Sequence, residues 1–103
     1  MFKLVFFVPE SHLEGVKSAL FEAGAGKVGN YDRCAWQVEG QGQFRPLVGS
    51  DAFIGSVDQV EMVSEYRVEL VCEEPNIIAV VEALKAEHPY ETPAYEVTKL
   101  ELY

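Results

Sequence analysis

The stretch from residue 88 to residue 95 gathers more side chains capable of chemistry than any other part of the chain. Its eight residues include an imidazole, a carboxylate, two phenols and two prolines that restrict the backbone φ angle. Two interpretations are open: a rigid connector whose aromatic rings pack on the core, or one rim of a ligand pocket at a subunit interface. In the second, the candidate ligand-binding residues are His88, Tyr90, Glu91 and Tyr95, joined by Asn30 and Tyr31 from a glycine-rich segment.

The sequence identifies no cofactor; a divalent metal ion is one candidate, with His88 and Glu91 as candidate ligands and His12 of a neighbouring subunit as a third. The two histidines and the two cysteines, Cys34 and Cys72, are scattered along the chain and form no close pair such as HxxxH or CxxC. The cysteines are therefore expected to be buried thiols rather than a bridge. A metal site is expected only between subunits.

The remaining motifs favour structure over catalysis. Residues 24–29 match GxGxxG, but a helical pattern precedes them and a strand pattern follows, which reverses the order that dinucleotide binding requires. They are typical of a helix end and a turn. No spacing favours a Ser–His–Asp triad, and Glu61, Glu65 and Glu69 on one strand face are typical of solvated charge. A binding protein is expected rather than an enzyme.

The elements that position these residues follow from the spacing of apolar side chains. Residues 2–8 form an almost unbroken apolar run, which predicts a buried central strand. Apolar residues three and four positions apart predict an amphipathic helix through residues 13–23. Its start has two candidate signals, Pro9 at the first helical position or Ser11 with Glu14 as a capping box.

Alternating apolar and polar residues predict two further strands. Residues 31–39 form the first, and the glycines of residues 40–42 predict a turn into a hairpin. Residues 60–72 carry the clearest alternation, and thirteen extended residues span roughly 43 Å, more than a typical strand of about 17–20 Å. Part of this strand is therefore expected to project, bend or bulge.

The chain ends with a second helix, from Ile77 to before Pro89, and a last strand within residues 95–103. The order strand, helix, strand, strand, helix, strand predicts an α+β ferredoxin-like sandwich, in which an antiparallel sheet carries two helices on one face and a long protruding β-hairpin. The other face and both edges then lack cover, so the sequence predicts self-association.

Composition limits the classes of partner. The 103 residues carry 8 basic and 17 acidic side chains, a net charge of -9, which disfavours binding to nucleic acid. No apolar run approaches the ~20 residues of a membrane span, and the N-terminus does not resemble a signal peptide. A cytoplasmic location away from membranes is expected.

Four spaced motifs extend along nearly the whole chain: residues 24–31, residues 40–46, Gly55 with Glu61, Glu65 and Arg67, and residues 88–95. Together they resemble the insert domain of the YqfO branch of the Nif-three-like proteins, and the start of the last motif also resembles CutA proteins. The resemblance implies that residues 1–103 are a single, stand-alone insert domain. It also implies a CutA-like or PII-like ferredoxin fold that trimerises through its sheets.

In full-length relatives, flanking domains hold a dinuclear metal centre, so the resemblance transfers no catalytic residue to these 103 residues. The leading hypothesis is a small homotrimeric binding or regulatory module whose ligand is unknown. One alternative is a divalent-metal-binding protein or metal-dependent enzyme with a site between subunits. Another is a protein–protein interaction module that docks through Trp36, Phe44 and Phe53.

Overall fold

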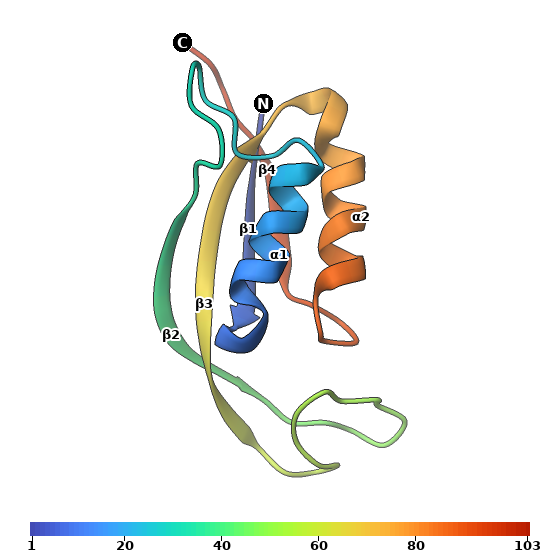
Figure 1. The fold of residues 1–103 in the computed structure, drawn as a ribbon. Coiled ribbons are helices and arrows are strands. Elements are labelled where there is room, and N and C mark those ends of the chain that lie inside the picture. Colours follow the sequence, from blue (N-terminus) through green and yellow to red (C-terminus); the bar gives the residue numbers. More distant parts are fainter.

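The computed structural model describes residues 1–103 and confirms the predicted order of elements (Figure 1). The helices and strands are β1 (Phe2–Pro9), α1 (Glu10–Glu22), β2 (Trp36–Phe44), β3 (Glu61–Cys72), α2 (Ile77–Glu87) and β4 (Tyr95–Lys99). A short 3-10 helix, Glu74–Asn76, precedes α2. The last strand is shorter than predicted, since it ends at Lys99. No helix has the length and apolar character needed to cross a membrane.

The four strands form one antiparallel sheet in the order β2-β3-β1-β4. Both helices lie on the same face of this sheet, as Figure 1 shows. This is the ferredoxin-like α+β arrangement that the sequence predicted. The apolar run of β1 is explained by its central position, because it pairs with β3 on one side and β4 on the other.

The core lies between the sheet and the two helices. Alternate residues of β1 and β3 point toward the helices and meet the apolar stripes of α1 and α2. The cluster has 12 buried residues: Leu4, Phe6, Val8, Leu13, Val16, Leu20, Ala25, Val68, Leu70, Cys72, Val80 and Leu84.

The start of α1 matches neither predicted signal, because the helix begins at Glu10, one residue after Pro9. Pro9 is the N-cap, in an extended conformation, and no side chain caps the helix. Ser11 Oγ instead lies 2.8 Å from Nδ1 of the adjacent His12, so the predicted capping box with Glu14 is wrong. Strand β1 enters the helix directly at Pro9, which places Ser11 within the first turn rather than before it. At the other end, Gly24 adopts a φ of +108° and ends the helix as expected.

The glycines of residues 40–42 do not form the predicted turn. Strand β2 continues through them to Phe44 and stays paired with β3 down to Glu61. Gly42 serves a close approach instead: the carboxylate of Glu65, on the neighbouring strand, fills the space that a side chain at position 42 would occupy. The alternation of apolar residues does not distinguish these two uses of glycine.

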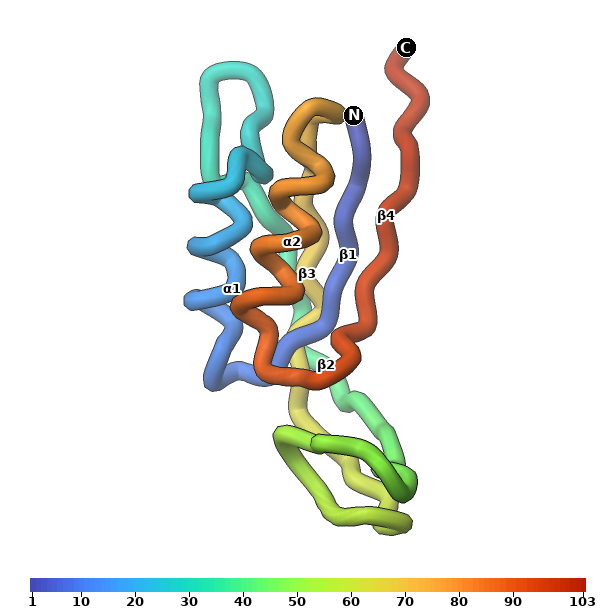
Figure 2. Tube along the Cα trace, turned by 90° about the vertical axis from the view of Figure 1, so that its right-hand side faces the viewer, coloured from blue at the N-terminus to red at the C-terminus, as the bar shows by residue number.

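The β2–β3 pair projects beyond the rest of the sheet, as predicted. β1 pairs with β3 only as far as Glu65, so residues 61–64 of β3 and residues 41–44 of β2 extend past it. A tip loop, residues 45–60, joins the two strands at this projecting end (Figure 2). The molecule is accordingly elongated, with extents of 46 × 24 × 24 Å.

Candidate functional site

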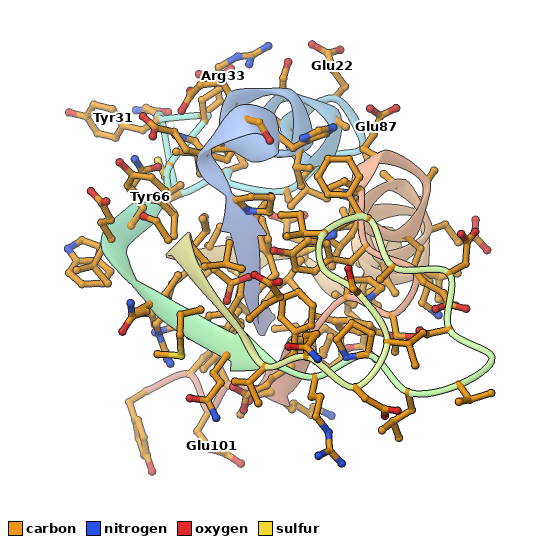
Figure 3. The ribbon with its side chains drawn as sticks, turned by 90° about the horizontal axis from the view of Figure 1, so that it is seen from below. Glu22, Tyr31, Arg33, Tyr66, Glu87 and Glu101 are labelled. Atoms are coloured by element: carbon orange, nitrogen blue, oxygen red, sulfur yellow. The ribbon has the colours of Figure 1, made fainter.

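A cavity of about 470 Å³ opens at the projecting end. The end of β2, the tip loop and the connector of residues 88–94 between α2 and β4 form most of its wall, and Phe7 of β1 and Glu65 of β3 complete it. Figure 2 shows the tip loop and the connector at the same end of the molecule, and Figure 3 views the molecule from that end. The cavity therefore joins parts of the chain that are far apart in sequence.

His88 anchors the connector to the sheet. Its side chain is buried, with only 6% exposed, and its Nε2 lies 2.6 Å from the backbone carbonyl oxygen of Phe7. Nδ1 accepts the backbone N–H of Tyr90 at 3.1 Å. These partners assign the neutral tautomer with the proton on Nε2. Burial is the main cause that lowers the pKa of His88 below its ordinary value.

Tyr90 forms one wall of the cavity and binds Glu65 of β3. Its hydroxyl donates to Glu65 Oε2 at 3.1 Å, across 25 residues of sequence. Burial, and next the charge of Glu65, raise the pKa of Tyr90 to about 12. The phenol therefore stays protonated at neutral pH and remains a donor to the carboxylate.

The carboxylate of Glu65 is held in a fixed position. Tyr90 binds one of its oxygens, and the absence of a side chain at Gly42 leaves room for the group against β2. Glu65 is half-buried, in contrast to the solvated strand carboxylate that the sequence pattern suggested. No local sequence pattern marks it, because its place opposite Pro9 at the end of the central strand is set by the register between β1 and β3.

Glu91 links the connector to the tip loop. Its Oε2 accepts the backbone N–H of Asp51 at 3.0 Å, and the side chain is exposed at the rim of the cavity. Phe53 of the tip loop faces Tyr90, with 6.3 Å between the ring centres. A second ring, that of His12 in α1, meets Phe53 edge-on, with 5.3 Å between the ring centres. The tip loop is thus held over the cavity by one hydrogen bond and two aromatic contacts.

The other predicted site residues lie elsewhere. Asn30 and Tyr31 are exposed in the loop after α1, at the opposite end of the sheet from the connector, and Tyr31 points outward in Figure 3. Tyr95 packs against the core, with Lys85 Nζ 5.7 Å from its ring centre. One chain therefore brings His88, Tyr90 and Glu91 together, and a site that also includes Tyr31 would need a second chain.

The metal-ligand candidates do not gather within the chain. No three His, Cys, Asp or Glu side chains are placed to hold one ion. Both ring nitrogens of His88 are occupied by backbone groups, and His12 packs its ring edge-on against Phe53, with 5.3 Å between the centres. Cys34 and Cys72 are free thiols, and Cys72 is buried.

The chain is similar to proteins about four times its length. It is 45% identical over 98 residues to the GTP cyclohydrolase 1 type 2 homolog of Mycobacterium leprae, which covers 95% of this chain and 26% of that protein. The crystal structure of a Bacillus cereus protein related to NIF3 matches with a TM-score of 0.83 and 40% identity, over 98% of this chain and 26% of that one. The chain thus spans about a quarter of these relatives.

The fold extends to more distant proteins. The periplasmic divalent cation tolerance protein CutA of Archaeoglobus fulgidus matches with a TM-score of 0.70 and 17% identity, over 100% of this chain and 87% of that one. At this identity the likeness shows the fold alone. No protein-family model matches the chain. The comparisons confirm the predicted resemblance to the Nif-three-like proteins and the predicted CutA-like fold.

Proposed function

We propose that residues 1–103, which resemble about a quarter of a Nif-three-like protein, act as an oligomeric binding module whose small ligand occupies the cavity at the projecting end. The cavity itself is the observation that supports this proposal. Its volume of about 470 Å³ lies within the range of small-molecule sites, and aromatic walls surround a few fixed polar groups. The connector, which the sequence singled out, supplies one wall.

The polar groups of the cavity suit binding better than catalysis. His88 lies behind the cavity wall rather than in it, and it uses both ring nitrogens to hold backbone groups, so it positions the connector rather than moving protons. Glu65 is held by a neutral phenol rather than poised beside a nucleophile. Pre-organised groups of this kind reduce the entropy lost when a ligand binds.

Self-association is the second part of the proposal. The sheet face opposite the helices has no cover, and on it Trp36 and Val38 of the edge strand β2 are 57% and 44% exposed. The outer edge of β2 is also unpaired along its nine residues. A homotrimer that buries this face, as the sequence resemblance implies, would protect both the apolar side chains and the free strand edge.

Native mass spectrometry of freshly purified, untagged protein tests both parts. We expect a trimer with an additional small mass. Ala52 lines the cavity, and Ala52→Trp should remove the additional mass without changing the trimer, whereas Ala86→Trp on the exposed side of α2 should retain both. An additional mass that survives Ala52→Trp would place the ligand outside the cavity, and a monomer would contradict the assembly.

A further inference from the structure

We propose that the ligand of this cavity is a small organic cation, an amine or ammonium group attached to an apolar body. The inference rests on the proposed function, because it names the chemical class for the same site. It follows from which groups line the cavity, how they are held, and which groups are missing from its wall.

Aromatic rings form a large part of the wall. Tyr90 lies between Phe44 and Phe53, with ring centres 6.1 and 6.3 Å apart and interplanar angles of 53° and 46°. Phe7 of β1 also lines the cavity. The faces of such rings attract cations, and their hydrophobic surface suits an apolar body. The rings come from four different segments, so the folded chain assembles them.

The ionisable acids and bases in the wall have one sign. Glu65 and Glu91 line the cavity, and no Lys, Arg or His does. Tyr90 adds no charge, because its pKa is raised to about 12. Arg67 lies 5.8 Å from the ring centre of Phe7, but it pairs with Glu69, and neither side chain lines the cavity. An anionic ligand would face two carboxylates with no positive partner.

Glu65 is ready to receive a positive group. A carboxylate has about four acceptor sites, and the single hydrogen bond from Tyr90 leaves the others available. The Tyr90 hydroxyl holds one of its oxygens and Gly42 leaves room for the group, so binding requires little reorganisation. An ammonium group beside Glu65 would place the rest of the ligand among Phe44, Phe53 and Tyr90.

Three probes with one phenyl ring and different charge test this: benzylammonium, benzyl alcohol and benzoate. Each is titrated into isotopically labelled protein, and amide NMR shifts of Phe53, Tyr90 and Glu91 are followed. We expect benzylammonium to shift these residues with a dissociation constant about tenfold lower than that of benzyl alcohol. Benzoate should bind most weakly.

The variant Glu65→Gln removes the charge while keeping an acceptor for the Tyr90 hydroxyl. It should lower the affinity for benzylammonium about tenfold and change the affinity for benzyl alcohol by no more than about twofold. Glu82→Gln, on the exposed side of α2, is the control for lost net charge and should leave both affinities unchanged. The amide spectrum of each variant shows that it remains folded.

Any one of three results would overturn the inference. The first is that benzyl alcohol or benzoate binds in the cavity at least as tightly as benzylammonium. This result would support the proposed function but reject a cation as the preferred ligand. Benzylammonium affinity that is unchanged in Glu65→Gln, or a failure of benzylammonium to shift the cavity residues, would also reject it. The proposed function is judged separately, by whether Ala52→Trp removes the mass seen in the native spectrum.

Discussion

Around β1, apolar side chains such as Leu4, Phe6 and Val8 are fully buried between the sheet and the helices. At the projecting end, by contrast, the connector and tip loop are held by individual polar contacts from His88, Tyr90 and Glu91. Burial is non-directional and tolerates exchange of apolar residues, whereas hydrogen bonds fix particular atoms. The difference indicates that the stability of the fold and the geometry of the cavity can be changed separately.

The largest expected effect comes from emptying the core. Phe6→Ala should lower the free energy of unfolding by about 3–5 kcal/mol, because Phe6 is fully buried in the centre of the sheet. Phe53 of the tip loop is half-exposed, so Phe53→Ala should lower the free energy of unfolding by less than about 1 kcal/mol. Urea unfolding measures both. Similar losses for the two phenylalanines would contradict the separation of core and cavity.

Removing the anchor of the connector should have the next largest effect. His88→Ala leaves the carbonyl of Phe7 and the N–H of Tyr90 without their partner, which should cost about 2 kcal/mol. Its amide NMR changes should concentrate in residues 88–94. His12→Ala is the matched control and should cost about 1 kcal/mol or less, since His12 hydrogen-bonds only to the adjacent Ser11 and makes one edge-on ring contact, with Phe53. Equal losses would show that the His88 contacts do not hold the connector.

The same side chain gives the projecting end a pH dependence. Because burial lowers the pKa of His88 in the folded protein, the unfolded chain takes up a proton at higher pH than the folded chain does. The stabilising effect of neutral His88 is therefore fully present when the pH is above the ordinary histidine pKa of about 6.5. It declines as the pH falls below that pKa. The difference in unfolding free energy between wild type and His88→Ala should narrow toward acid. A difference that stays constant between about pH 7 and pH 5 would contradict this.

A smaller effect distinguishes two glycines of one strand. At Gly42 a methyl group would collide with the Glu65 carboxylate, whereas at Gly40 nothing lies within 4 Å. Gly42→Ala should cost about 1 kcal/mol and weaken benzylammonium binding. Gly40→Ala should be neutral or stabilise by up to about 0.5 kcal/mol. Thermal unfolding measures the stability of both variants, and the benzylammonium titration measures their affinity. If the two variants agree in both, the Glu65 carboxylate has freedom to move.

The fold was predictable because its signals are local. The apolar run of β1, the spacing in α1 and α2 and the alternation in β3 each show within a few residues which face is buried. The turn assigned to residues 40–42 was wrong because glycine permits both a turn and a close approach between strands. Only the position of Glu65 on the neighbouring strand settles which applies.

The cavity was predictable in part. The chemistry of residues 88–95 indicated His88, Tyr90 and Glu91, but the role of Glu65 depends on a partner 25 residues away. Phe7 was visible only as a strand residue, since nothing in its neighbourhood indicates that it lines one cavity with the tip loop. Asn30 and Tyr31 were grouped with the connector, yet within one chain they lie at the other end of the sheet.

The most direct test of the claim that the cavity binds an organic cation is a crystal structure of the protein co-crystallised with benzylammonium. We expect the probe in the cavity of each chain, with its ammonium group within hydrogen-bond distance of Glu65 and its ring among Phe44, Phe53 and Tyr90. A probe bound elsewhere, or a cavity filled by side chains of a neighbouring subunit, would contradict the claim that the projecting end is the ligand site.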